Sequence, residues 1–492
     1  MKKIILTTSI LTLLASSIYA DWQYSNGKGD GYSYDSNGIY TDSRGYGAIG
    51  IEGSHTVIQD VDYSNKSYIV NATTSSNSDF VNTKMALSGE YQDAVFGIYN
   101  STVKDSNFSG SSFTGTSIYD QHAMYVSASA SLENVNLSNS MFSSKVMSNI
   151  NSGFTAVGTL KDINFSNSTF ESFGSFCENI TFRGNVENIN LSGITSKGFK
   201  EATDSLIDRA GVDIKDATSS SIGFYANAKN INLNNSKHNA LKGIAIWSGS
   251  NVENLTAQNA EFKNVDMDSD KIVYGSGTLK NADFRGATLT AFGSEEAVAI
   301  TAENISDYST LKNVMLSDGT IFSTKEIWST ENAGLILAEG ETFTVSKYES
   351  PVAMFATFST RGNDISAKLT VDSTLNGGTI VLEDGALLEV SDGVTLTISD
   401  TVEFVVADGV SDVSEVLSLG DNSTIVMAGY TDEEASGAFA NLFKSEDGSS
   451  LEFTAPESFV IKGSEIPEPS EYAGVLGALA IAFALMRRQP RK

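Results

Sequence analysis

A six-residue pattern recurs along this chain and constrains its fold more than any other feature. It places apolar residues at positions one, four and six and Asn or Asp at position three. The copies are IQDVDY from Ile58, VKDSNF from Val103, LENVNL from Leu132, LKDINF from Leu160, VENINL from Val186, AKNINL from Ala228, VENLTA from Val252, LKNADF from Leu279 and LKNVML from Leu311. Ser106 and Ala257 are small where the pattern calls for a larger apolar residue.

The spacing of these copies predicts a solenoid. Most copies begin 24 to 32 residues apart, a period typical of stacked repeats that each contribute a short strand. We interpret the apolar positions as alternating with period two, and the surrounding Ser, Asn, Gly and Thr are poor helix formers. The expected fold is all-β, a right-handed parallel β-helix (β-solenoid) with terminal caps. The longer spacings, 45 residues before Val103 and 42 before Ala228, are expected to hold looped-out insertions or a degenerate coil.

The third position of the pattern predicts a column of side chains about 4.8 Å apart, the spacing between neighbouring strands. Amides in such a column can hydrogen-bond from coil to coil. The expected structural ladder is Asn134, Asn188, Asn230, Asn254, Asn281 and Asn313, preceded by the carboxylates Asp60, Asp105 and Asp162. A ligand-binding carboxylate row is the alternative, which the predominance of Asn disfavours. Phenylalanines that follow the strands are expected to fill the core: Phe113, Phe142, Phe170 and Phe262.

The body divides into four segments. Residues 21–57 are rich in Tyr and Gly and are expected to form an N-terminal cap, or else a glycan-facing loop. Residues 58–368 hold the solenoid of roughly 27-residue repeats. Residues 369–410 form a β-stem of shorter period, built from narrower coils or from β-hairpins. Residues 411–466 are expected to cap the stack, with a helix near Glu433 to Phe443. The stem is similar to the one that follows β-helical, autotransporter-passenger-like or adhesin-like bodies.

Both ends of the chain carry targeting features. Lys2 and Lys3 precede an apolar stretch, which predicts a signal peptide at residues 1–20 that is cut between Ala20 and Asp21. Residues 467–492 begin with Pro467, Glu468 and Pro469, continue with an uncharged run from Tyr472 to Met486, and end in a basic cluster that includes Arg487 and Arg488. At ~1.5 Å per residue this run gives a transmembrane helix of ~22 Å, which spans a bilayer only marginally.

The three-part tail resembles the PEP-CTERM sorting signal of exported bacterial proteins. The resemblance implies an exosortase-type processing enzyme as partner and transient anchoring in the inner membrane through the C-terminal helix. It also implies delivery to the cell envelope, the cell surface or the extracellular matrix. A plain anchor that is never cut is the alternative.

Composition limits the chemistry. The net charge of −28 disfavours nucleic acid as a partner. Cys177 is the one cysteine, so no intrachain disulfide can form, and a buried apolar filler is its expected role. Asp266, Asp268 and Asp270 resemble an oxygen-ligand loop, but Lys271 departs from the calcium-binding pattern. This triplet is either a site for an incidental divalent cation or a solvated turn, and no other cofactor is expected.

We find no set of catalytic residues in the sequence and expect a protein that is not an enzyme. The predicted function is a structural or adhesive surface protein, with exopolysaccharide or surface glycans as candidate partners. The alternative is a carbohydrate-active β-helix enzyme, a polysaccharide lyase or hydrolase. A cluster of carboxylate and Arg side chains on one face of the solenoid would favour that alternative.

Overall fold

The computed structural model describes most of residues 94–464, with longer gaps at 199–219, 266–270, 306–309, 325–331, 349–365 and 452–455, and the backbone of strands β1 to β10 before residue 89. The predicted signal peptide at 1–20 and the predicted sorting tail at 467–492 lie outside the described residues, as do Asp266, Asp268 and Asp270. The chain forms two compact units, the first ending near Asn332 and the second formed by 333–348 with the chain from Ser366.

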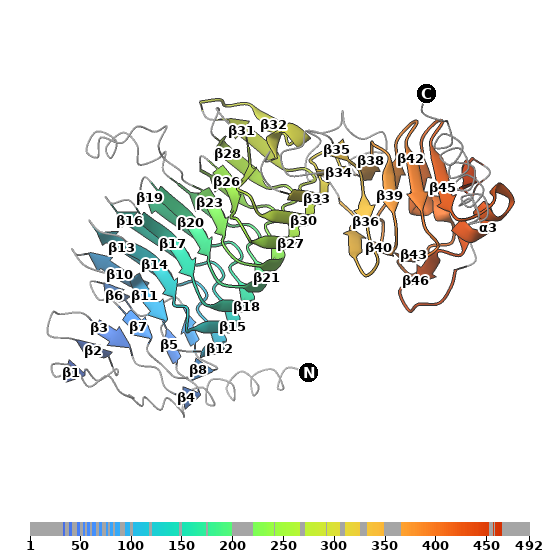
Figure 1. Ribbon diagram of the computed structural model, residues 1–492. Helices are drawn as coiled ribbons and strands as arrows, with labels where there is room; N and C mark the ends of the chain where they lie inside the picture. The colour runs from blue at the N-terminus through green and yellow to red at the C-terminus, as the bar shows by residue number, and fades with distance from the viewer. Residues whose placement is uncertain are drawn as a thin grey trace, which may run out of the picture. The chain divides into compact units, whose positions relative to one another are not determined.

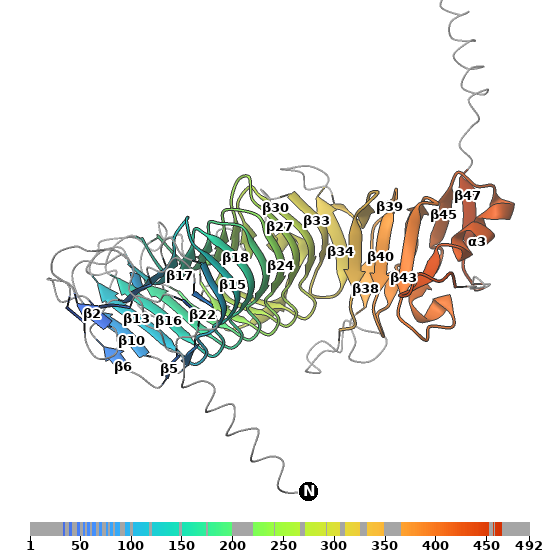
Figure 2. The same ribbon diagram turned by 90° about the horizontal axis from the view of Figure 1, so that it is seen from below.

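The first unit is a solenoid of parallel strands, as the repeat predicts. Each coil passes through three sheets in turn, and Figures 1 and 2 show the coils stacked on one another. Sheet 1 contains β7 (Tyr68–Val70), β11 (Ala94–Ile98), β14 (Gln121–Val126), β17 (Ile150–Ala156), β20 (Phe176–Phe182), β23 (Ser220–Phe224), β26 (Lys242–Ile246) and β29 (Val273–Tyr274). All of its neighbouring strands pair in parallel.

Sheet 2 carries the six-residue pattern. Its strands are β12 (Thr102–Asn107), β15 (Ser131–Asn136), β18 (Thr159–Asn164), β21 (Val186–Asn190), β24 (Ala228–Asn232), β27 (Asn251–Thr256), β30 (Thr278–Asp283) and β33 (Thr310–Met315). Sheet 3 runs from β6 (Asp62–Ser64) and β10 (Lys84–Ser88) through β13 (Ser112–Ser117), β16 (Met141–Val146), β19 (Thr169–Phe173), β22 (Thr195–Lys197), β25 (Lys237–Asn239) and β28 (Glu261–Val265) to β31 (Thr288–Ala291).

The interpretation of the pattern as a period-two strand is wrong. In β15, Leu132 and Val135 are both buried although they are three residues apart, which a regular strand does not allow. Asn134 lies between them, next to Val135. It has a φ of 52° and takes no part in the strand pairing. This left-handed residue bends the strand locally, so that positions one and four both face the core.

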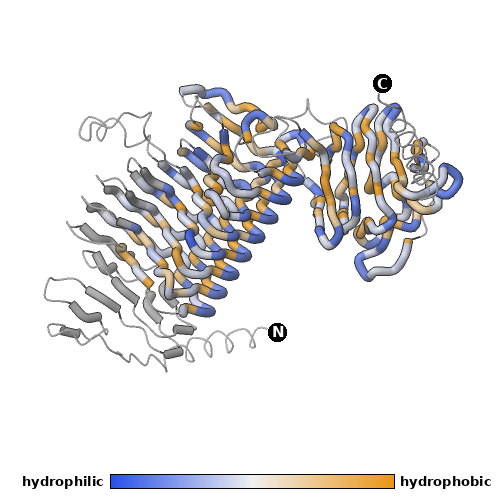
Figure 3. Tube along the Cα trace, in the orientation of Figure 1, coloured by the Kyte–Doolittle hydropathy of each residue, from blue (hydrophilic) through white to orange (hydrophobic). Residues whose placement is uncertain are grey.

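The phenylalanines expected to fill the core do so. Phe113, Phe142 and Phe170 are fully buried and stack on successive coils, with ring centres 5.3 and 4.8 Å apart. In later coils the same column continues as Ser196, His238 and Phe262. The His238 ring stacks on Phe262 at 4.9 Å, which makes it part of the core packing. Figure 3 shows apolar and polar stretches repeating from coil to coil along this unit.

The two long spacings have different origins. Val186 pairs directly with Ala228, so the residues between β22 and β23 are an insertion and no coil is missing there. Val103 pairs instead with Ser75 in β8 (Ser75–Ser76), which lies between the first two copies of the pattern. That spacing therefore contains a degenerate coil that lacks the pattern.

The second unit is also built from parallel coils, which settles the choice between narrow coils and hairpins. One sheet contains β36 (Ile336–Leu337), β39 (Ser373–Leu375), β42 (Thr395–Ile398), β45 (Thr424–Ala428) and β47 (Ile461–Ser464), and another contains β37 (Thr342–Val345), β40 (Gly378–Leu382), β43 (Val402–Val406) and β46 (Phe443–Ser445). A third joins β38 (Ala367–Leu369), β41 (Leu388–Val390) and β44 (Leu417–Leu419). In the Asp-Gly turns of the second unit, Gly385 and Gly393 have φ of 69° and 73°.

Residues 411–464, expected to cap the stack, contribute strands β44 to β47 to it. The expected helix is present as α3, which spans Asp432–Ala440 and ends before Phe443, where β46 begins. Thr431 and Glu434 form a capping box at its N-terminus. In the expected N-terminal cap, β1 (Ser33–Tyr34), β2 (Ile39–Thr41) and β3 (Gly47–Ile49) form an antiparallel sheet.

Candidate functional site

The asparagines at position three are joined by hydrogen bonds from coil to coil. Each side-chain amide donates to the Oδ1 of the preceding coil, from Asn188 to Asp162 at 2.6 Å and from Asn230 to Asn188 at 2.7 Å. The run continues through Asn254, Asn281 and Asn313 at 2.9, 3.3 and 3.4 Å. Asn134 belongs to a separate pair, in which its amide donates to Asp105 at 2.7 Å.

The position of the carboxylates in this column follows from the direction of donation. Asp162 accepts from Asn188 but has no amide to offer Asn134, so the column is interrupted between these coils. Asp105 and Asp162 therefore stand at the start of the two runs, where a member needs only to accept. The bonds made by Asn134 and Asn188 are exposed to solvent, whereas Asn313 at the far end of the column is fully buried.

A second amide column, at position five, was missed by the sequence reasoning. The amides of Asn136, Asn164 and Asn190 donate to the preceding coil at 3.0, 3.1 and 2.9 Å. The Oδ1 of the same residues also accepts a backbone N–H two residues later, as Asn164 does from Ser166 at 3.1 Å. These side chains hold both the corner of each coil and its contact with the next coil.

A column of alternating charge runs along sheet 2 at position two. Register pairs Lys161 with Glu187, Glu187 with Lys229, and Lys229 with Glu253 on successive strands. The column extends from Lys104, which forms an ion pair with Glu133, to Lys280, whose Nζ lies 3.5 Å from Glu253. The alternation is visible in the sequence once the six-residue copies are aligned.

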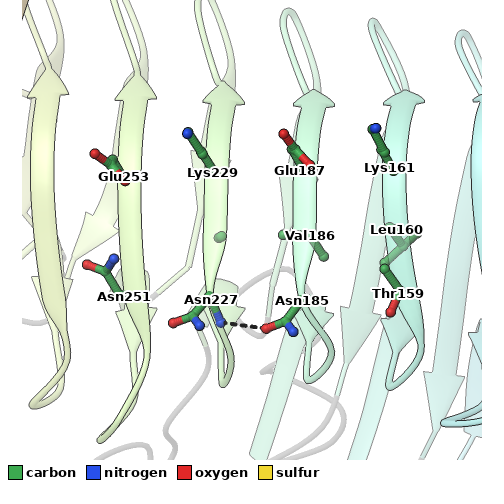
Figure 4. Close-up of a pocket in the computed structure, with 11 residues that line it drawn as sticks. Thr159, Leu160, Lys161, Asn185, Val186, Glu187, Asn227, Lys229, Asn251 and Glu253 are labelled. Carbon is green, nitrogen blue, oxygen red and sulfur yellow. Dashed lines mark hydrogen bonds between the residues drawn. The ribbon is translucent and has the colours of Figure 1, made fainter. Parts of the chain in front are cut away.

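Beside this column lies a shallow groove of about 360 Å³. Figure 4 shows its two edges: one row is the alternating charges from Lys161 to Glu253, and the other is Thr159, Asn185, Asn227 and Asn251. The backbone N–H of Asn227 donates to Asn185 Oδ1 at 3.3 Å. The charged residues that line the groove are two Lys and two Glu, which alternate on neighbouring strands, so their charges balance.

The outer face of sheet 1 carries a different cluster, centred on the carboxyl group of Glu178 in β20. That carboxylate accepts hydrogen bonds from the Tyr225 hydroxyl at 2.8 Å, from Thr181 at 3.0 Å and from Trp247 Nε1 at 3.2 Å. These residues come from three successive coils. The exposed side chain of Arg183 lies nearby, with its guanidinium carbon 5.1 Å from the centre of the Tyr225 ring.

The environment shifts the pKa values of this cluster upward. Burial raises the pKa of the Glu178 carboxyl, and the hydrogen bonds from Tyr225, Thr181 and Trp247 and the charge of Arg183 offset the rise only in part. Burial and the adjacent Glu178 charge raise the pKa of Tyr225 well above its ordinary value. Burial also raises the pKa of Tyr274 to about 12. Both phenols therefore remain protonated near neutral pH.

The described histidines are held in hydrogen-bond networks. His238 is 1% exposed, and its ring nitrogens contact the hydroxyls of Ser221 and Ser236 at 2.6 and 2.7 Å inside the core. His122, on sheet 1, contacts the hydroxyls of Ser152 and Thr155, both at 3.1 Å. The backbone of Cys177 lies in β20.

Within the described part of the chain, no group of three or more His, Cys, Asp or Glu side chains could hold a metal ion. Nor does any helix there have the length and apolar character needed to cross a membrane.

No family model and no curated protein matches the chain. Among solved structures it is similar to the PL6-family alginate lyase AlyGC, with 9% sequence identity, 85% of this chain and 71% of that chain covered, and a TM-score of 0.15. A point mutant of the same enzyme gives 10% identity, coverage of 84% and 77%, and a TM-score of 0.13.

Proposed function

We propose that this chain is a non-catalytic surface protein with a structural or adhesive role, built on a solenoid of right-handed winding. The observation that carries the proposal is the pairing of its outer polar side chains across the coils. The amides at positions three and five and the charges at position two each bond to or face the same position of the next coil. Such columns tie successive coils of the first unit together and present repeated shallow surfaces.

The ends of the chain support an address outside the cytoplasm. A signal peptide at residues 1–20 and a tail resembling the PEP-CTERM signal at residues 467–492 fit export, sorting by an exosortase-type enzyme and transient membrane anchoring. The mature body then faces the cell envelope or extracellular matrix, where exopolysaccharide and surface glycans are available partners. The net charge of the full chain, −28, disfavours nucleic acid as a partner.

A carbohydrate-active enzyme is the second candidate, and the Glu178 cluster is the observation that favours it. A carboxyl with a raised pKa beside Arg183 on one face of a β-solenoid is an arrangement suited to general acid catalysis. One feature weighs against it. Hydrolysis requires a second carboxyl about 5–10 Å away, and the described groups that act on the Glu178 carboxyl, namely Tyr225, Thr181, Trp247 and Arg183, include no carboxyl.

The test is incubation of the purified full-length protein with a panel of acidic and neutral glycans, with and without calcium. We expect binding without new reducing ends and without unsaturated products. Turnover that is abolished by Glu178→Gln would overturn the non-catalytic proposal and identify the enzyme. Calcium-dependent turnover that is lost with Asp268→Asn would also overturn the non-catalytic proposal, and it would place the active site at the triplet Asp266, Asp268 and Asp270.

A further inference from the structure

Three aromatic side chains form a strip along the outer face of sheet 1. The ring of Tyr225 stacks on that of Trp247, with centres 5.2 Å apart, and Trp247 meets Tyr274 edge-on at 5.7 Å. All three are half-buried, so part of each ring faces solvent. Tyr225 and Trp247 directly follow Phe224 and Ile246, which point into the core, so strand alternation directs the next side chains outward.

A cation lies at each end of the strip. Arg183 lies over Tyr225, and the ammonium group of Lys242 lies 4.3 Å from the centre of the Tyr274 ring. Arg183 is exposed and Lys242 is half-buried. The whole chain carries a net charge of −28. Two cations beside three aromatic rings therefore contrast with the negative charge of the chain as a whole.

The Glu178 carboxylate holds the strip in place from beneath. It binds the Tyr225 hydroxyl and the Trp247 indole, and so fixes two rings from different coils in one orientation. Gly223 makes room for this arrangement, because a Cβ at that position would lie 2.3 Å from Glu178 Oε2. The Tyr274 hydroxyl is fixed separately, by Ser220 at 2.9 Å. The rings are therefore ordered before any ligand arrives.

We propose that this strip, with Arg183 and Lys242, binds an acidic glycan whose sugar rings contact the aromatic side chains and whose carboxylates meet the two cations. The inference rests on the proposed function, since it assigns the adhesive role to one site and one class of glycan. Apolar faces of sugar rings suit aromatic surfaces, and planar Arg suits a carboxylate. Together with Arg183, which follows β20, the strip reaches across coils to β29, about 14 Å at the spacing of neighbouring strands, so the site favours an oligosaccharide over a single sugar.

The test is calorimetric titration of the full-length protein with tetragalacturonate, an acidic oligosaccharide, and with maltotetraose, a neutral one of equal length. Wild-type protein should bind the acidic probe and bind the neutral probe at least about tenfold more weakly. Arg183→Gln and Trp247→Ala should each lower the affinity for tetragalacturonate at least about tenfold. Lys229→Gln is the matched control, because it removes one cation from sheet 2, and its affinity should equal that of the wild type.

Unfolding curves accompany each variant, and Trp247→Phe, which keeps an aromatic ring, covers the case in which Trp247→Ala does not fold. Equal affinity for the two probes, no binding of tetragalacturonate, or equal losses in Arg183→Gln and Lys229→Gln would each overturn the proposed site. Glycan binding that survives Arg183→Gln, and also Trp247→Ala where that variant folds, would reject the strip while leaving the adhesive function in place. Cleavage of the probe by wild-type protein would reject the non-catalytic function while leaving the strip as the place of binding.

Discussion

At the scale of single residues, the choice of Asn or Asp at position three follows from backbone conformation. Asp105, Asn134, Asn188 and Asn254 have φ between 46° and 57°. This left-handed region costs most side chains about 1–2 kcal/mol, and Asn, Asp and Gly visit it most readily. Asn adds an amide that reaches the preceding coil, which Gly lacks. Conformation thus limits the choice to three residue types, and the ladder selects Asn among them.

Asn188 separates these two contributions. Asn188→Leu should lower the free energy of unfolding by about 2 kcal/mol, because it adds left-handed strain to the loss of two side-chain hydrogen bonds. Asn188→Gly loses the same hydrogen bonds without that strain, and its loss should be smaller. Urea denaturation of both variants measures the difference. Equal losses in the two variants would show that the backbone conformation at Asn188 contributes nothing to the preference.

His238 should make stability depend on pH. Burial lowers the pKa of this ring to about 3, whereas an exposed His titrates near 6.5. Below pH 6.5 the unfolded chain gains a proton that the folded protein does not accept until about pH 3. The free energy of unfolding should therefore fall as the pH drops through this window, by about 1.4 kcal/mol per unit at most. Above pH 6.5 this residue contributes no pH dependence.

His238→Gln provides the control, because its side chain does not titrate. The difference in unfolding free energy between wild type and variant should be constant above pH 6.5 and shift by about 2–3 kcal/mol in favour of the variant between pH 7 and pH 4.5. Carboxylates elsewhere titrate in both proteins and cancel in the comparison. A difference that stays constant down to pH 4.5 would mean that His238 is protonated in the folded state or exposed to solvent.

At the scale of elements, the alternating charges at position two favour one register between coils. Glu187 faces Lys161 on one side and Lys229 on the other. Glu187→Lys would place three like charges in a row and should destabilise the solenoid by about 1 kcal/mol, while Glu187→Gln should cost less. Thermal unfolding at low and high salt measures both. The penalty of Glu187→Lys should shrink at high salt, and a penalty independent of salt would exclude charge repulsion as its cause.

The sequence predicted the stacking of elements better than their local shape. Copies of the pattern mark sheet 2, and the turn signals near Asp384 and Asp392 mark the second unit, because apolar spacing and turn residues are local properties. The bend at position three was missed because the apolar residues at positions four and six are two residues apart, as they would be in a regular strand. The choice between an insertion and a degenerate coil depended on which strands pair, as Val186 does with Ala228, and pairing between distant strands leaves no local trace.

The aromatic strip shows the same limit. Arg183 and Tyr225 lie three residues before a copy of the pattern, whereas Trp247 and Tyr274 lie five residues before one. Their offsets differ because the turn between sheet 1 and sheet 2 varies in length, so no fixed period aligns them. Glu178 looks like an ordinary surface carboxylate in the sequence, and its role depends on residues from later coils.

At the scale of the whole molecule, each unit gains its stability from contacts between successive coils. Cys177 stands alone, so no disulfide within the chain can add to them. Hydrogen-bonded columns, stacked phenylalanines and paired charges each repeat along the first unit, and each repeats because a coil meets only its neighbours. Stability of this kind is compatible with the exported location that we propose.

Processing of the tail is the prediction that concerns the chain as a whole. If residues 467–492 are a sorting signal, the mature protein should end near Pro467 and lack the apolar run from Tyr472 to Met486. Because Pro disfavours continuation of a helix, we expect the Pro467-Glu468-Pro469 segment to be extended and open to a protease. Mass spectrometry of the C-terminal peptide of surface-exposed protein measures the cut. Replacing Pro467 and Pro469 by Ala should leave uncut, membrane-anchored protein, whereas finding Arg487 and Arg488 on the mature wild-type form would show that the tail is a permanent anchor.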